Sequence, residues 1–150
     1  MKPIFINYIC LFLSISAIGQ KSPLNFKHLT LEDGLSQSSV APIFKDSQGF
    51  MWFGTEDGLN RYDGTHFKIF RPQPDDEESL SSSYILSIVE QEDGFLWIGT
   101  KNGLNYFDPN TEKFQRFQNI QGNSHNLGNN NINSLETSVT GNLLVGTANG

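Results

Sequence analysis

The fold of this chain is decided by a stretch that recurs, Gly49-Phe-Met-Trp-Phe-Gly-Thr-Glu-Asp-Gly-Leu-Asn-Arg-Tyr-Asp63. A second copy, Gly94-Phe-Leu-Trp-Ile-Gly-Thr-Lys-Asn-Gly-Leu-Asn-Tyr-Phe-Asp108, lies 45 residues later and is identical at nine of fifteen positions. A third copy, Gly141-Asn-Leu-Leu-Val-Gly-Thr-Ala-Asn-Gly150, follows after 47 more and shares six of its ten positions with the second. An internal period of about 45 residues indicates a propeller or a solenoid.

Short β-type runs favour the propeller over the solenoid, because no segment of the repeats has apolar residues at a helical period. Each of the first two copies contains four such runs. They are Val40 to Lys45, Met51 to Thr55, Leu59 to Tyr62 and Phe67 to Phe70 in the first copy, and Ile85 to Val89, Leu96 to Thr100, Leu104 to Phe107 and Phe114 to Phe117 in the second. The pairs Asp57-Gly58 and Asn102-Gly103 separate the second run from the third and predict type I′ hairpin turns. We therefore expect an all-β chain with four antiparallel strands per repeat.

Apolar residues on both faces of the first run indicate how the sheets are arranged. Val40, Pro42 and Phe44 point one way, and Ala41 and Ile43 point the other. A sheet that copies of itself cover on both faces is a propeller blade. The predicted fold is an incomplete β-propeller with blades at 35–79 and 80–126 and a truncated blade at 127–150.

A few repeated residues are expected to be structural. Trp52 and Trp97 are predicted to pack between blades, and Leu144 replaces them in the third copy. Three glycines that follow these positions, Gly54, Gly99 and Gly146, suggest close approach of strands, while Gly58 and Gly103 belong to the turns.

The amino-terminal residues predict export. Lys2 precedes an apolar stretch of about 15 residues and then the small residues Ala17 and Gly19, as in a signal peptide cleaved after Gly19. A buried helix or a retained membrane anchor are the alternatives for residues 1–19. Residues 20–34 are expected to supply an outer strand, Phe26 to Leu29, that clasps a last blade. Because 131 residues at about 45 per blade give fewer than three blades, we expect the chain to be the amino-terminal fragment of a longer protein.

Composition excludes several kinds of function. With 10 basic and 16 acidic side chains and a net charge of −6, the chain offers no general attraction to nucleic acid. A single cysteine, Cys10, cannot form an internal disulfide or a thiolate metal site. His28, His66 and His125 have no repeated partner, and Leu59 and Arg61 occupy positions where a calcium loop needs oxygen ligands. No catalytic residue, metal site or cofactor is therefore expected.

The longest polar segments are two connections between blades, residues 71–79 and 119–126. Both join a fourth strand to the next first strand, so they should lie on one face of the disc, beside the Asp57-Gly58 and Asn102-Gly103 turns. Loops on a rigid scaffold carry most recognition, which makes this face the expected binding surface. The acidic residues 75–78 favour a solvated loop over a ligand site, and individual ligand contacts cannot be named.

Two longer motifs resemble a known family. They are Phe26-x-x-Leu-x-x-Glu-Asp-Gly-Leu-Ser-Gln-Ser-Ser-Val40 and Asp46-Ser-Gln-Gly-Phe-Met-Trp-Phe-Gly-Thr-Glu-Asp-Gly-Leu-Asn-Arg-Tyr-Asp-Gly64. Together with the later copies, which extend the match over residues 24–150, they resemble the opening of the two-component regulator propeller family. The third copy departs from the pattern at Asn142 and Leu144.

The resemblance implies the sensor part of a hybrid two-component histidine kinase, located in the periplasm and anchored to the membrane by a later segment. It further implies an oligosaccharide ligand, additional blades, a homodimer and a kinase region outside this chain. Two other classes stay open: a secreted propeller enzyme acting on glycans, and a glycan-binding or adhesion module. The enzyme would need acids, Arg and Tyr or His converging on the axis, whereas the repeated residues here are structural.

Overall fold

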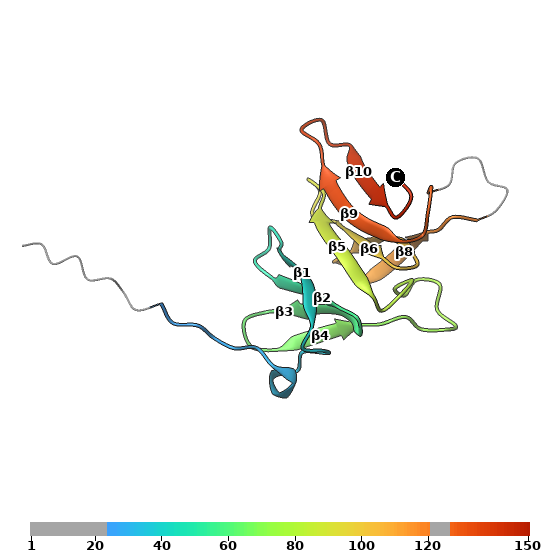
Figure 1. Cartoon of the computed structure of the whole chain (residues 1–150). Coiled ribbons are helices and arrows are strands. Elements are labelled where there is room, and N and C mark those ends of the chain that lie inside the picture. The colour runs from blue at the N-terminus through green and yellow to red at the C-terminus, as the bar shows by residue number, and fades with distance from the viewer. Residues whose placement is uncertain (1–23, 121–126) are drawn as a thin grey trace, which may run out of the picture.

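The computed structural model describes residues 24–120 and 127–150, which form three consecutive antiparallel sheets preceded by a short 3-10 helix, η1 (Leu31–Asp33) (Figure 1). The first sheet, blade 1, has the strand order β1-β2-β3-β4. Its strands are β1 (Val40–Lys45), β2 (Met51–Thr55), β3 (Gly58–Tyr62) and β4 (Phe67–Phe70). The predicted signal peptide at 1–19 and its cleavage after Gly19 lie outside the described residues.

Blade 2 repeats this arrangement in the order β5-β6-β7-β8. Its strands are β5 (Ile85–Glu90), β6 (Leu96–Thr100), β7 (Gly103–Asp108) and β8 (Lys113–Phe117). A third sheet is the hairpin of β9 (Ile132–Thr137) and β10 (Leu143–Thr147). The predicted all-β fold with four-stranded antiparallel blades is confirmed.

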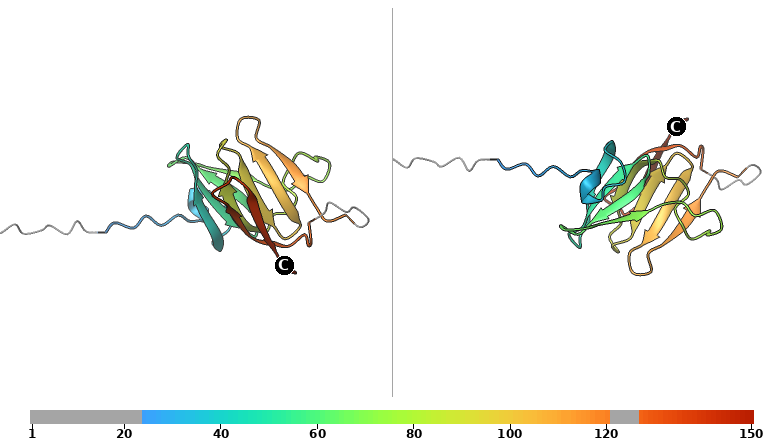
Figure 2. Two further views of the ribbon diagram at one scale, coloured as in Figure 1. Left: turned by 90° about the horizontal axis from the view of Figure 1, so that it is seen from above. Right: turned by 90° about the horizontal axis from the view of Figure 1, so that it is seen from below.

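The sheets stack so that their first strands, β1, β5 and β9, follow one another along the stack, with β5 between the other two (Figures 1 and 2). This is the arrangement of propeller blades around an axis, with the first strand of each blade innermost. Pro42 lies in β1, which is the edge of its sheet, and an edge strand can lack one N–H donor. A register shift between Val40 and Ile43 marks a bulge in the same strand.

The core lies between the facing sides of blades 1 and 2. Trp52 is fully buried, and its ring meets Phe107 of blade 2 edge to face at 5.4 Å between centroids. Phe70 contacts both rings and also Phe114, which joins the outer strands β4 and β8. The remaining buried members of this cluster are Leu59, Leu80, Ile85, Leu96 and Ile98.

Polar contacts lie at the margin of the interface between blades 1 and 2. Glu112, at the turn before β8, accepts a hydrogen bond from Arg61 at 3.0 Å and forms an ion pair with Lys68. The Arg61 guanidinium also lies 4.9 Å from the ring centroid of Phe50. The hydrogen bond from Lys68, and the charges of Lys68 and Arg61, lower the pKa of Glu112.

The prediction that both faces of the first run are buried holds for β5 and is wrong for β1. Every residue of β5 is buried or half-buried, because this strand lies between two sheets. Along β1 half-buried and exposed residues alternate, and Ile43 is 60% exposed. Among the described residues no sheet covers that side of β1.

The strand predicted at Phe26–Leu29 is not formed. Residues 24–30 belong to no strand, and the side chain of Phe26 is 81% exposed. An outer strand needs the third strand of its own blade as a partner, and the described residues offer none to this segment. The segment instead contacts blade 1 where the Lys27 ammonium donates to the Tyr62 hydroxyl at 2.6 Å. A clasp role for residues 20–34 stays a prediction.

Candidate functional site

The predicted binding face is built on turns that a buried hydrogen-bond chain holds rigid. In blade 1 the Asn60 amide donates to the Ser36 hydroxyl at 2.9 Å. Ser36 lies 2.9 Å from the Thr55 hydroxyl, which donates to the Gly58 carbonyl at 3.0 Å. Since Thr55 uses its proton on Gly58, Ser36 must be the donor to Thr55. Asn60 and Thr55 are almost fully buried, so this chain fixes the β2–β3 turn from inside the protein.

Blade 2 contains the same chain at the β6–β7 turn. Asn105 donates to Ser81 at 2.9 Å, Ser81 lies 3.1 Å from Thr100, and Thr100 donates to the Gly103 carbonyl at 2.8 Å. In the third copy Gly128 takes the place of the serine, while Thr147 still donates to the Gly150 carbonyl at 2.6 Å. The turns are therefore similar scaffolds. The complete set of hydrogen bonds is present in two copies, and part of it in the third.

The predicted type I′ geometry of these turns is wrong. Such a turn requires positive φ at both central residues, and among the described residues Glu112 is the only non-glycine with positive φ. Thr55 pairs with Gly58, so the loop is Glu56–Asp57, and Gly58 follows it with φ of 123°. The Thr55 hydroxyl also accepts from the Asp57 amide at 3.0 Å, so threonine stabilises a turn that needs no left-handed Asp.

The connection from blade 1 to blade 2 begins beside the β2–β3 turn, as expected from the topology. The Arg71 guanidinium donates to both carboxylate oxygens of Asp57, at 2.8 and 3.2 Å, and to the Asp57 carbonyl at 3.1 Å. This pairing lowers the pKa of Asp57 and raises that of Arg71. The turn and the start of the connection therefore form one unit at the surface.

The same connection then binds the outer strand of blade 2. The Phe114 amide, on the free edge of β8, donates to the Glu78 carbonyl at 2.8 Å. The Arg116 guanidinium donates to the carbonyls of Ser79 and Asp76, each at 2.7 Å. Residues 76–79 thus cover part of an edge strand that would otherwise present unpaired amides to solvent.

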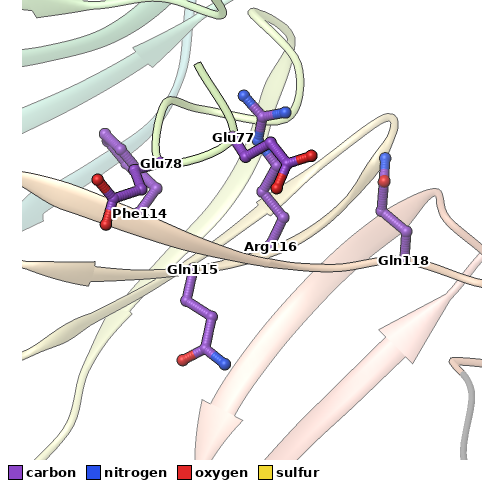
Figure 3. A pocket seen from close by; sticks show the side chains of 6 residues that line it. All are labelled: Glu77, Glu78, Phe114, Gln115, Arg116 and Gln118. Atoms are coloured by element: carbon purple, nitrogen blue, oxygen red, sulfur yellow. The ribbon is translucent and has the colours of Figure 1, made fainter. Parts of the chain in front are cut away.

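An open pocket of about 580 Å³ lies between residues 77–78 and β8 (Figure 3). It is lined by Glu77, Glu78, Phe114, Gln115, Arg116 and Gln118. Gln115 points away from the carboxylates of Glu77 and Glu78 in this view, and the Arg116 guanidinium rises toward Glu77. Arg116 donates to the carbonyls of Ser79 and Asp76 and to the Ser79 hydroxyl, so its guanidinium holds the wall of this polar recess in place.

Gly54 and Gly99, two of the residues predicted to be structural, lie where neighbouring sheets approach each other. A Cβ on Gly54 would lie 2.4 Å from Pro42 and 2.7 Å from Ile85 of the next blade. A Cβ on Gly99 would likewise lie 2.7 Å from Ile132. Gly58 and Gly103 have positive φ, and a Cβ on Gly146 would meet the Ser134 hydroxyl. Trp52 is buried between blades and Trp97 is half-buried.

Histidine and metal chemistry finds no support in the described residues. His66 lies at a turn where its Nδ1 is 2.9 Å from the Thr65 hydroxyl, and His28 is exposed. His125 lies outside the described residues. Within residues 24–120 and 127–150 there is no group of three or more His, Cys, Asp or Glu side chains able to hold a metal ion. In the same ranges no helix is long and apolar enough to cross a membrane.

Several residues that build this face were not assigned by the sequence analysis. They are the two serine, threonine and asparagine sets and Arg116, which holds residues 76–79 against β8. The sets recur at equal spacing in the Leu-Ser, Gly-Thr and Gly-Leu-Asn motifs, so the repeat itself could have identified them. Arg116 of β8 aligns with Ile69 of β4 and carries no such signal.

Two segments of the chain, residues 34–57 and 79–102, match the family model described as two component regulator propeller. Each segment contains the innermost strand of a blade and the strand that pairs with it, together with the start of the turn described above.

Two relatives are informative. The chain is 54% identical over 65 residues to histidine kinase P4 of Formosa agariphila, a match over 43% of this chain and 5% of that protein. It also resembles the crystal structure described as the extracellular domain of the hybrid two component system BT3049 from B. thetaiotaomicron, with a TM-score of 0.73 and 31% identity. That match covers 79% of this chain and 17% of the other. The chain therefore spans only a small part of either relative.

Proposed function

We propose that this chain, a member of the two-component regulator propeller family, is the amino-terminal part of the ligand-sensing propeller of a hybrid two-component histidine kinase. The observation that carries this proposal is the coincidence of the family match with the two blades. Both relatives named above belong by their descriptions to histidine kinase or two-component systems. The kinase would lie in a part of the protein outside this chain.

The proposed location is the periplasmic side of the membrane, with the complete protein anchored there. The predicted signal peptide at 1–19 and the extracellular relative from B. thetaiotaomicron support export. A chain whose single cysteine lies within that peptide suits an oxidising compartment.

The proposed ligand is an oligosaccharide, and the proposed signalling unit is a homodimer. Ligand binding can shift a sensor only if one arrangement of the paired sensors binds it more tightly than the other. Turns held by buried hydrogen bonds from Asn60 and Asn105 favour such a mechanism, since little ordering of the binding face is needed when ligand binds. The propeller itself performs no phosphotransfer in this proposal.

The test uses the complete protein in membrane vesicles. Labelled ATP is added with and without a panel of soluble oligosaccharides, and phosphate incorporated on histidine is measured. We expect incorporation whose rate changes with one member of the panel. Absence of labelling would contradict the kinase assignment, and labelling that no oligosaccharide alters would contradict glycan sensing.

A further inference from the structure

The three turns on the binding face differ most in the residue that follows the threonine. Each reads Gly-Thr-x-Asx-Gly, and the variable residue is Glu56 in blade 1, Lys101 in blade 2 and Ala148 in the third copy. The threonine and glycine of each turn make the hydrogen bonds described above, so the scaffold does not depend on the variable side chain. A rigid repeated turn therefore presents an acid, a base and a methyl group at equivalent places.

Tyr84 lies between the acid and the base. It precedes β5, at a position where the other copies have Ser39 and Asn131. The Lys101 ammonium lies 3.5 Å from the centroid of the Tyr84 ring. On the other side, the neighbouring Glu56 carboxylate raises the pKa of the Tyr84 hydroxyl. The three residues come from two blades and meet where those blades adjoin.

Main-chain hydrogen bonds fix this meeting point. The Gly58 amide, at the end of the Glu56 turn, donates to the Ser83 carbonyl of blade 2 at 2.8 Å. The Lys101 amide donates to the Tyr84 carbonyl at 3.1 Å. Glu56 is positioned from the other side, since its amide donates to the Gln37 side chain at 3.2 Å. The cluster is thus held by backbone, and its side chains are not needed to hold the blades together.

We propose that Glu56, Tyr84 and Lys101 form a ligand-contact site for a neutral polyhydroxylated molecule at the inner end of the seam between blades 1 and 2. This proposal rests on the proposed sensing function and locates one of its binding sites. Glu56 and Lys101 are exposed and Tyr84 is half-buried, so all three can be reached from solvent. Among the described residues neither Glu56 nor Lys101 belongs to an ion pair, which leaves acceptors on the one and donors on the other.

The ligand class follows from the charges. An anion would meet the Glu56 carboxylate on a chain of net charge −6, and a cation would meet the Lys101 ammonium. A hydroxyl group both donates and accepts, so neighbouring hydroxyls can bond to carboxylate and ammonium together. The edge of the Tyr84 ring offers apolar contact for the C–H groups of the same molecule.

The test measures binding of soluble gluco-, manno-, xylo- and arabino-oligosaccharides to the chain, with backbone amide NMR to locate the contact. Tyr84→Ala, Lys101→Ala and Glu56→Gln are compared with Lys45→Ala and Glu92→Gln, which change exposed residues at the opposite end of the sheets. We expect amide shifts centred on residues 56, 84 and 101. Each cluster variant should weaken binding about tenfold or more, as for loss of a hydrogen bond to a charged group, and the two controls should not.

Tyr84→Phe keeps the ring and removes only the hydroxyl group that faces Glu56, so an intermediate loss of affinity in this variant would exclude a general folding defect. Binding that the cluster variants leave unchanged, or shifts centred elsewhere, would overturn this site while the sensing function stands. If no oligosaccharide of the panel binds, the site is overturned together with glycan sensing, and the phosphorylation experiment separately decides the kinase assignment.

Discussion

The structure has two seams, one between blades 1 and 2 and one between blade 2 and the β9–β10 hairpin. They share their main-chain contacts and differ in their side chains. Gly58 donates to the Ser83 carbonyl across the first seam at 2.8 Å, and Gly103 donates to the Asn130 carbonyl across the second at 2.7 Å. The glycines before them, Gly54 and Gly99, let the next inner strand approach in both places. The geometry of stacking is thus repeated without change.

Side-chain packing makes the first seam much stronger than the second. Trp52 is completely buried against the rings of blade 2, whereas the ring contacts of Trp97 among the described residues are with Tyr106 and Phe117 of its own sheet. Leu144, at the tryptophan position of the third copy, is 57% exposed. Residues 127–150 contain one charged side chain, Glu136, so they have little with which to build a counterpart of the Glu112 network. Backbone geometry therefore sets how blades stack, and side chains set how firmly.

Truncation of the two tryptophans should separate the seams most clearly. Trp52→Ala is expected to lower the free energy of unfolding by about 3–5 kcal/mol, because it leaves a large cavity between blades. Trp97→Ala should cost roughly half as much, because that ring is half-buried. Urea unfolding of both variants measures the difference, and equal losses would contradict the asymmetry.

Two glycines test the backbone side of the comparison. Gly54→Ala would place a methyl group 2.4 Å from Pro42 and 2.7 Å from Ile85, so we expect a loss of about 1–3 kcal/mol from overpacking. Gly146→Ala would meet the Ser134 hydroxyl, an exposed side chain that can rotate away, and should cost less than about 1 kcal/mol. Thermal unfolding of the pair checks this order, and a larger loss for Gly146→Ala would refute it.

The charged margin of the first seam should contribute less. Glu112→Gln removes the ion pairs to Arg61 and Lys68, all partly exposed, and is expected to cost about 0.2–1 kcal/mol at low salt. In high salt the loss should shrink, because screening weakens partly exposed pairs. Glu136→Gln, in β9 of the third sheet, serves as the control. A loss that is independent of salt would show that packing of Glu112 matters more than its charge.

The smallest effect concerns the turns before the outer strands. Asp63 accepts hydrogen bonds from the amides of His66 and Thr65 and from the Thr65 hydroxyl, which lowers its pKa to about 2. Asp108 of blade 2 has a lowered pKa for a similar reason, through the Asn110 amide and the Thr111 hydroxyl.

Because the pKa of Asp63 in the folded protein is lowered from its ordinary value of 3.8 to about 2, the carboxylate stabilises the folded state fully above pH 3.8. This stabilisation is lost as the pH falls through about 2. Titration of both carboxyl carbons by NMR measures the two values. A midpoint for Asp63 at its ordinary value would contradict the turn geometry.

Much of the fold could be predicted because local patterns specify strands. The runs at 40–45, 51–55 and 67–70 have the observed bounds of β1, β2 and β4, and the repeat placed equivalent strands in blade 2. The wrong turn type at Asp57 had a local cause as well: the dipeptide Asp-Gly is compatible with several turns, and the Thr55 side chain selects among them.

The candidate site was less predictable because it is assembled from separate segments. Glu56 and Lys101 are 45 residues apart, and nothing in either turn indicates that Tyr84 lies between them. The attachment of residues 76–79 to Arg116 likewise depends on how the connection folds back over β8.

By itself the sequence determined the all-β class, the period and the strands, since alternation of apolar residues and turn-forming glycines act within a few residues of one another. Only the tertiary structure decided which tryptophan is buried, which face of β1 stays open and which charged groups meet at a seam. These properties depend on what packs against each sheet, and contacts between residues distant in the chain leave no local pattern.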